Sequence, residues 1–346
     1  MGTRRSRYHR RVLRRALAVV GLVGAVAHAE SEVTVTLNQQ GRDLAAQIGA
    51  SVDDLGANAE ARIDALFELQ QLPRLLRAFA DTGAFANHGV GVDYQPDASD
   101  VTFGVVAGSA IASDARLSSD EERVFSATVV NYGLVAGVNL GRWRHPRWTV
   151  FANGSYASTT IRGLSGTLLS GGAHVVAQLV AGRTHGAIAW TGLAATTGLE
   201  YARWKISLAD TLDTNITVTG TNDHATVGML SSGTLTVLAE TFAVPLTVTT
   251  GVRLADRIGL YAGGGMAILS GASTVTAELD SLLTINADDL PIGTATIRAS
   301  ESDGPRRVLW HALAGAQLHT RHARVYVQGG VAPGERGLAL GVRGAL

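Results

Sequence analysis

The sequence predicts an all-β transmembrane barrel, antiparallel and up-and-down, of about ten strands (range 8–12), with a short helical N-terminal extension. Three observations predict it. The chain begins with an export-type leader, and its last two thirds alternate apolar residues with small or polar ones at period two. The connections between the alternating segments are, in turn, short and long, as in barrels that cross a membrane.

Residues 1–29 have the features of a secretory signal peptide. The first fifteen residues hold seven arginines and no acidic residue, and the apolar run of residues 16–27 leads into Ala27-His28-Ala29. A basic start, a short apolar run and an A-x-A site are typical of a cleaved leader. The apolar run is shorter than the roughly 20 residues that a spanning helix needs. We therefore expect export in a Gram-negative-type bacterium and a mature chain that starts at Glu30.

The composition of the mature chain excludes several classes of protein. Removing the seven leader arginines from 29 basic residues leaves 22 against 29 acidic ones, a net charge of −7, so a nucleic-acid partner is not expected. Cysteine is absent, which excludes disulfides and thiolate metal sites. No run of 18 apolar residues follows the leader, which excludes helical membrane spans. A soluble all-β protein and a membrane barrel remain.

Alternation with period two is clearest in residues 130–140, 242–254, 308–319 and 337–346. The pattern assigns one face to lipid and the other to the lumen. The lipid face includes Leu134, Leu246, Ala314 and Leu340, and the lumen face includes Asn131, Thr247, Gly315 and Gly341. A soluble sandwich would show a similar alternation with its core on the apolar side. The pattern alone therefore leaves both folds open.

The lengths of the connections favour the barrel. Ten candidate strands lie near residues 101–111, 128–140, 147–161, 173–182, 188–206, 241–254, 258–270, 307–318, 323–331 and 337–346. The long polar connections are 112–127, 162–172, 207–240 and 271–306, and the short ones are 141–146, 183–187, 256–257 and 319–322. Outer-membrane barrels have short periplasmic turns and long outer loops. Only the connection 332–336 departs from this order, and segments such as TNITVTGT indicate strands that extend beyond the membrane as ribbons.

Aromatic residues near the short turns are expected to mark a membrane boundary. Trp143 and Trp148 flank one short turn, and Trp310 and Tyr326 are assigned to the neighbourhood of another. Tryptophan and tyrosine prefer the headgroup level because their rings are apolar with one polar group. In a soluble protein, Trp148 and Trp310 would instead be buried in the core.

On these patterns, residues 101–346 resemble bacterial outer-membrane β-barrel proteins in general. The resemblance rests on alternation and turn spacing, and no characterised family is identified. It implies a location in the outer membrane of a Gram-negative-type bacterium, with outer-membrane lipid and the barrel assembly machinery as partners. The chain departs from such barrels at its end, which is Gly344-Ala345-Leu346 where they usually carry an aromatic residue.

Residues 30–100 form a separate, helical N-terminal extension in this interpretation. Residues 33–37 suit a short strand, and residues 51–72 repeat apolar positions every three or four residues, which predicts an amphipathic helix. Ser51 and Asp54 resemble a capping box at its start, and Pro73 separates it from a second short helix. The extension is expected either to be periplasmic or to send a helix into the lumen. Small inward residues would leave room for that helix: Gly133, Gly137, Gly263, Gly265 and Gly315.

The sequence offers little chemistry, so no enzymatic activity, cofactor or metal is expected. No nucleophile, phosphate-loop or zinc motif is present, and Asp223-His224 and the pair His319 and His322 suit solvated loops. A ten-stranded barrel leaves at most a narrow passage. The candidate lumen-lining residues are Asn131, Asn139, Gln178, Arg253 and Gln317. We expect a surface-binding or structural protein that acts through long polar extracellular loops. The alternative is a narrow, porin-like channel or transporter for small solutes, and an outer-membrane enzyme is a remote third.

Overall fold

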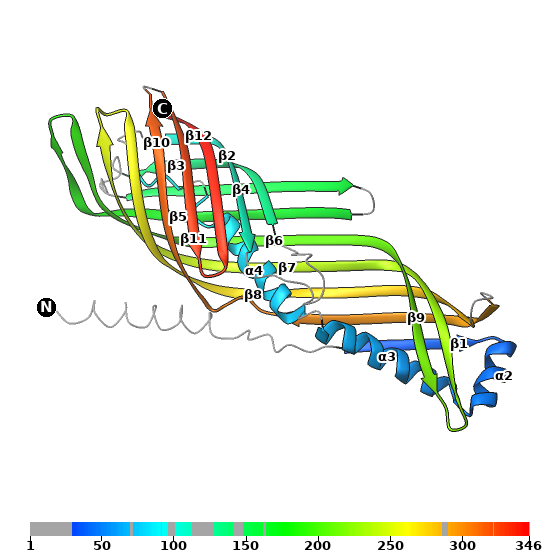
Figure 1. Ribbon diagram of the computed structural model, residues 1–346. Coiled ribbons are helices and arrows are strands. Elements are labelled where there is room, and N and C mark those ends of the chain that lie inside the picture. The colour runs from blue at the N-terminus through cyan, green and yellow to red at the C-terminus, as the bar shows by residue number, and fades with distance from the viewer. Residues whose placement is uncertain are drawn as a thin grey trace, which may run out of the picture.

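The computed structural model describes residues 30–69, 72–90, 92–95, 101–112, 128–140, 148–161, 164–285, 290–320 and 322–345, so the expected leader and Trp143 lie outside it. The elements are β1 (Glu30–Leu37), α2 (Gln39–Ile48), α3 (Val52–Leu69), α4 (Leu72–Asn87), β2 (Val101–Ala112), β3 (Thr128–Asn139), β4 (Trp148–Ile161), β5 (Leu164–His185), β6 (Ile188–Thr219), β7 (His224–Leu254), β8 (Ile258–Ile285), β9 (Leu290–Asp303), β10 (Val308–His319), β11 (Ala323–Ala332) and β12 (Glu335–Ala345). Figure 1 shows a barrel from which part of the sheet projects far to one side.

Ten strands close into a ring. Their order is β8-β10-β11-β12-β2-β3-β4-β5-β6-β7, and β7 pairs with β8 to complete the circle. All ten neighbouring pairs are antiparallel. Closure leaves the ring without an unpaired edge. The predicted antiparallel barrel of about ten strands is confirmed.

The outer wall of the ring is apolar. Leu134, Leu246 and Leu340 are 69%, 46% and 53% exposed, while the residues between outward positions are buried inside. An apolar surface that continues around a whole barrel is not stable in water but suits lipid. No described helix is long and apolar enough to cross a membrane. The chain is a transmembrane barrel, because its ten strands close into a ring whose outer face is apolar.

The aromatic boundary differs from the prediction. Trp148 is 49% exposed and lies at the end of its strand, as expected. Trp310 is 62% exposed but lies near the start of β10, at the end of the barrel opposite the short turn at residue 320. Tyr326 is only 4% exposed and faces inward, so its assignment to a membrane boundary is wrong. Tyr326 lies at a position of β11 whose side chain faces inward. The alternation of side chains along the strand therefore decides where its ring lies, and not the preference of tyrosine for the headgroup level.

Three of the predicted long loops are mostly strand. Ile161 pairs with Leu164, and residues 164–172 of the expected loop 162–172 are the start of β5. In place of loop 207–240, β6 and β7 continue as a hairpin whose last pair is Thr219 with His224. In place of loop 271–306, β8 continues to Ile285 and pairs with β9. These segments form paired strands because backbone hydrogen bonds between strands do not require apolar side chains. Polar segments can therefore continue the sheet as ribbons.

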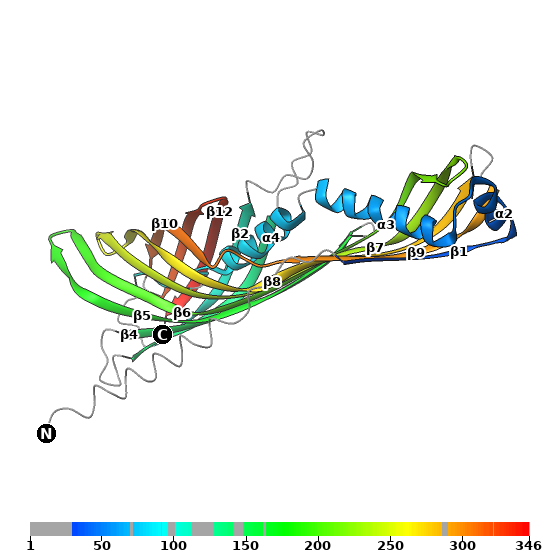
Figure 2. The same cartoon turned by 90° about the horizontal axis from the view of Figure 1, so that it is seen from below.

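The projecting sheet consists of the far parts of β6, β7 and β8 together with β9 and β1, and two helices cover one face (Figure 2). An apolar cluster joins the helices to the sheet: Leu37, Ala45, Ile48, Leu55, Ala59, Ile216, Val218, Val227, Met229, Ala277, Leu283, Ile292, Ala295, Ile297 and Ala299. The predicted capping box is present, since Ser51 Oγ accepts from the Asp54 amide at 3.1 Å. The Ser51 backbone N–H also donates to Asp54 and holds the pKa of that carboxyl below its usual value. We call β1, α2, α3 and these ribbons the projecting module.

Candidate functional site: the filled lumen

Helix α4 lies inside the barrel and leads toward the projecting module at its N-terminal end (Figure 1, Figure 2). Its apolar residues Leu75, Leu76 and Phe79 are at most 6% exposed and pack against inward side chains of the wall. The ring of Phe79 stacks on that of Trp204 with centroids 4.7 Å apart. Each buried side chain of this size stabilises the packing by about 1.5–3 kcal/mol. The helix and residues 88–95 after it are called the plug below.

Two ion pairs hold α4 where it enters the lumen. Asp81 is fully buried, accepts from the backbone N–H of Arg306 at 2.8 Å and lies 3.2 Å from Nε of the same arginine. Arg77 Nη2 lies 2.9 Å from Asp303 Oδ2. Both partners come from the end of β9 and the turn that follows it. The plug is thereby fixed to the base of the projecting module.

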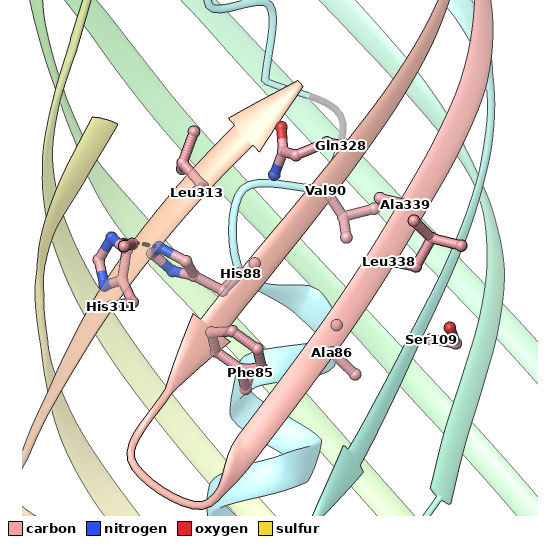
Figure 3. A pocket seen from close by; sticks show the side chains of 13 residues that line it. Phe85, Ala86, His88, Val90, Ser109, His311, Leu313, Gln328, Leu338 and Ala339 are labelled. Carbon is pink, nitrogen blue, oxygen red and sulfur yellow. Dashed lines mark hydrogen bonds between the residues drawn. The ribbon is translucent and has the colours of Figure 1, made fainter. Parts of the chain in front are cut away.

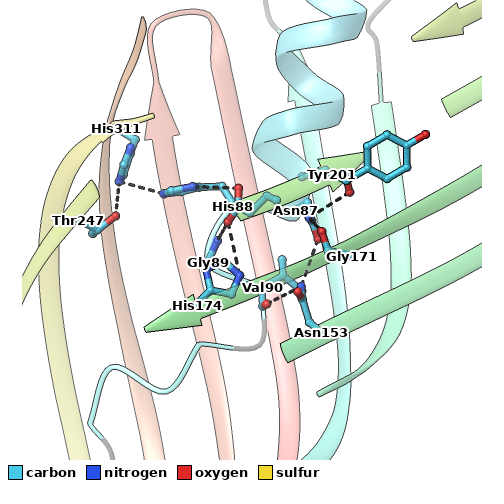
Figure 4. Close-up of polar contacts among 12 residues, drawn as sticks. Asn87, His88, Gly89, Val90, Asn153, Gly171, His174, Tyr201, Thr247 and His311 are labelled. Carbon is cyan, nitrogen blue, oxygen red and sulfur yellow. Dashed lines mark hydrogen bonds and ion pairs between the residues drawn. The ribbon is translucent and has the colours of Figure 1, made fainter. Parts of the chain in front are cut away.

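Where α4 ends, asparagines tie the backbone of the plug to the wall (Figure 4). Asn87 Nδ2 donates to the Gly171 carbonyl at 3.1 Å, and Asn131 Nδ2 donates to the Ala86 carbonyl at 3.1 Å. Asn153 Nδ2 donates to the Val90 carbonyl at 2.8 Å and to Asn87 Oδ1 at 3.2 Å. Two carbonyls at and after the end of α4 are thus bonded by side chains of two strands, and the plug in turn donates to a carbonyl of β5.

Three histidines and one glutamate form the next layer (Figure 4). His88 Nε2 lies 2.9 Å from His311 Nε2, and His88 Nδ1 lies 3.5 Å from Glu200 Oε2. His174 Nε2 lies 3.8 Å from Glu200 Oε1, which accepts from the Gly89 amide at 3.1 Å. These four side chains, called the histidine cluster, are all less than 10% exposed. Among the described residues, no group of three or more such side chains has a geometry that could hold a metal ion.

Gly89 forms the turn of the backbone in this layer. Its φ of +65° is in the left-handed region that favours glycine, and a Cβ there would lie 2.4 Å from the Tyr94 hydroxyl. This conformation turns the chain at the end of α4 and directs the Gly89 amide at Glu200. The backbone therefore supplies one of the few donors to this buried carboxylate.

A buried charge cluster anchors the other end of the plug. Asp93 is fully buried and pairs with Arg324 of β11 and, at 3.5 Å, with Arg343 of β12. The Arg343 guanidinium also donates to the Val92 carbonyl at 2.7 Å and lies 4.2 Å from the centre of the Tyr326 ring. The two arginine side chains are 3% and 1% exposed. One buried carboxylate thus pairs with two guanidiniums that come from neighbouring strands.

A small cavity lies beside the plug. It has a volume of about 30 Å³ and lies between the plug and strands β2, β10, β11 and β12, lined by Phe85, His88, His311, Gln328 and others (Figure 3). That volume holds no more than a few water molecules. The side chains of α4 and of the wall around it are buried and in contact, as in a protein core.

The five candidate lumen residues occupy different surroundings. Asn131 and Gln317 are each 2% exposed, and Asn131 contacts the plug. Arg253 Nη2 lies 3.5 Å from the Gln95 carbonyl, also in the plug. Gln178 donates to the Thr191 carbonyl at 3.1 Å, within the wall, and Asn139 is half-buried at the end of β3. The structure brings none of the five into one group.

The inward glycines do not admit the plug in the way the sequence suggested. Cβ atoms at Gly137 and Gly315 would lie 2.4 Å from the rings of Phe151 and Tyr261, so side chains of the wall itself fill that space. The plug instead approaches Gly108, where a Cβ would lie 3.3 Å from the Ala86 carbonyl oxygen. The prediction that these glycines make room for the helix was therefore wrong. The space beside a glycine is set by the side chains of the neighbouring strand, and the sequence of one strand does not show which residues those are.

Sequence reasoning did not single out the histidine cluster or the charge cluster. Glu200 and Arg343 were detectable in principle, since each places a charge at an inward position of an alternating strand. His88 and Asp93 carry no such signal, because they lie in an irregular segment. His88 and His311 are 223 residues apart in the chain and meet only in the folded barrel.

Comparisons with known proteins find one matching family model and several distant solved structures. A family model described as Lsa36-like matches residues 26–345, and no curated protein matches the chain. The translocator domain of autotransporter NalP from Neisseria meningitidis has 11% identity and a TM-score of 0.28, over 82% of this chain and 98% of that one. The CymD monoaromatic hydrocarbon channel has 8% identity and a TM-score of 0.28, over 79% and 98%. Ail of Yersinia pestis has 11% identity and a TM-score of 0.19, over 59% and 97%. Similarities this distant do not extend to function.

Proposed function

The chain belongs to the Lsa36-like family, and we propose that its barrel is a closed outer-membrane anchor that displays the projecting module at the cell surface. The module then acts as a surface-binding or structural element. The plug in the lumen is the observation that carries this proposal, because it is bonded to several strands and occupies space that a channel would need.

The lengths of the strands support display. Strands β6 and β7 have 32 and 31 residues, whereas about 9–11 residues suffice to cross the membrane. Roughly twenty residues of each strand therefore extend beyond the bilayer, a distance of about 65 Å at 3.3 Å per residue. A large, ordered structure of this kind presents a surface that short loops do not.

The turns support an outward direction for the module. The opposite end of the barrel has tight connections, such as the turn at Ala255 and Asp256 between β7 and β8. Short turns are periplasmic in outer-membrane barrels. Strand β2 begins at this end, since Val101 pairs with Val138 near the end of β3. The chain would thus pass through its own barrel, from the module outside to β2 on the periplasmic side.

A narrow channel is the second candidate, and it requires the plug to leave its contacts. The cavity of about 30 Å³ does not favour solute passage in the described state. An enzymatic role has no supporting arrangement of residues in the described lumen.

Cysteine labelling tests the proposed display, since the chain has no cysteine of its own. Glu32→Cys in β1 and Asp223→Cys at the tip of the β6–β7 hairpin should react with an impermeant reagent on intact cells. His322→Cys, in a short turn, should react only after the outer membrane is opened. The reverse pattern would place the module in the periplasm and refute display. Steady single-channel conductance at pH 7.5 would favour the channel instead.

A further inference from the structure

The plug and the wall meet through a contact between two imidazoles. His88 of the plug and His311 of β10 place their Nε2 atoms 2.9 Å apart, with ring centroids 4.0 Å apart in an edge-to-face arrangement (Figure 3, Figure 4). Thr247 Oγ1 of β7 lies 3.0 Å from the same His311 nitrogen. Both imidazoles are shielded from solvent, at no more than 7% exposure of the side chain or residue.

This contact requires at least one neutral ring. A hydrogen bond between two ring nitrogens needs a donor on one side and a lone pair on the other. In one such arrangement a neutral His311 donates from its other ring nitrogen to the backbone of Leu309, and its Nε2 lone pair accepts from His88 Nε2. A fully protonated imidazole has two donors and no lone pair. If both rings were protonated, two N–H groups would face each other at 2.9 Å with like charges.

The surroundings cannot compensate a second charge. The titratable groups around the pair are Glu200 of β6, His174 of β5 and Tyr94 of the plug. The contact from β7 is the neutral Thr247. One carboxylate therefore faces three imidazoles, and acid adds positive charge to a buried space. Buried charges without partners are strongly unfavourable.

We propose that the His88–His311 contact is an acid-sensitive latch, which holds the plug against β10 at neutral pH and releases it when both rings are protonated. Histidine ordinarily changes charge between pH 5 and 8, but burial beside a second imidazole opposes the second charge, so release is expected at a more acid pH than this range. The release concerns α4 and the turn at Gly89. The arginines around Asp93 stay charged at any working pH, so the far end of the plug remains fixed. This inference goes beyond display of the module and does not depend on which side the module faces.

A buried cysteine can report the release. Ala86→Cys places a thiol where the wild-type side chain is 4% exposed, beside the latch, and Asp223→Cys provides an exposed reference. Reaction with a small methanethiosulfonate is measured for both variants on purified, folded protein in detergent at pH 7.5 and 3.0. Dividing the rate of Ala86→Cys by that of Asp223→Cys at the same pH removes the intrinsic effect of pH on the thiol. We expect this ratio to rise at least tenfold at pH 3.0 and to return to its starting value at pH 7.5.

Two variants separate the latch from general acid damage. His311→Gln keeps an acceptor for His88 but removes the second charge, so its labelling ratio should change less than twofold between the two pH values. His322→Gln alters an exposed histidine of a short turn and should respond like wild type. Folding of each variant is checked by the gel shift between unheated and boiled samples, and His88→Gln replaces His311→Gln if the latter does not fold. A wild-type ratio independent of pH, or a full acid response without the second histidine, would overturn the proposal.

Discussion

Replacement of Asp93 by asparagine should destabilise the barrel more than any exposed substitution. Asp93 is the carboxylate between Arg324 and Arg343, and all three side chains are at most 3% exposed. Asparagine has nearly the same shape and can still accept hydrogen bonds, so the variant removes the charge with little change in packing. The Asp93 carboxylate would then no longer pair with either of the two buried guanidiniums.

The expected loss follows from burial. Breaking a buried ion pair by removing one partner costs about 3–5 kcal/mol, because the remaining charge is left uncompensated. This corresponds to a decrease of about two to three and a half orders of magnitude in the folding equilibrium constant. The Arg203–Glu240 pair provides the matched control, since its atoms are 3.0 Å apart but its side chains are 50% and 46% exposed. Glu240→Gln should cost about 0–1 kcal/mol.

Urea titration of protein refolded in lipid vesicles measures both losses. Tryptophan fluorescence follows unfolding, because the chain has five tryptophans. The free energy of unfolding is compared only where folding and unfolding curves coincide. If Asp93→Asn lost no more than Glu240→Gln, the arginines would be hydrated in the folded barrel, and the description of the lumen as a packed core would be wrong.

Three further predictions test the wall and the plug. Leu246→Arg should cost roughly 2–4 kcal/mol and reduce assembly, as seen in the gel shift, whereas Leu246→Ala should assemble; equal assembly would contradict a lipid-facing position. Phe79→Ala should lose about 3–5 kcal/mol in the urea titration, because it removes the ring stacked on Trp204, and a loss below 1 kcal/mol would mean that the ring is not part of a packed core. Gly108→Val should speed the labelling of Ala86→Cys at pH 7.5, because its side chain occupies space now used by the plug; unchanged labelling would argue against that close approach.

The barrel was predictable because its causes are local. A strand with one face in lipid must alternate, and Leu134 and Leu340 show that alternation within their own segments. The number of strands was predictable from the lengths of the turns, which are also local features of the sequence. The projecting sheet was harder to predict, because its polar strands satisfy no membrane pattern. They are held by pairing with distant strands and by the apolar cluster beneath α2 and α3, such as Val218 with Ile297.

The site was less predictable than the wall. The alternation of residues along β3 predicted that Asn131 faces the lumen. It does not show which residue an inward side chain will contact, here the Ala86 carbonyl. The plug is irregular after Asn87, and its partners come from strands spread over the rest of the chain. Asp93 and Arg324 are 231 residues apart, so their pairing is a property of the closed ring and not of any segment.

The plug is joined to the rest of the chain at both of its ends. At one end it continues toward β2, a strand of the ring, and at the other toward α3 and β1, which pairs with β9. A plug that left its contacts with the wall would therefore stay tethered at two places, and its return would be a rearrangement within one molecule, independent of protein concentration.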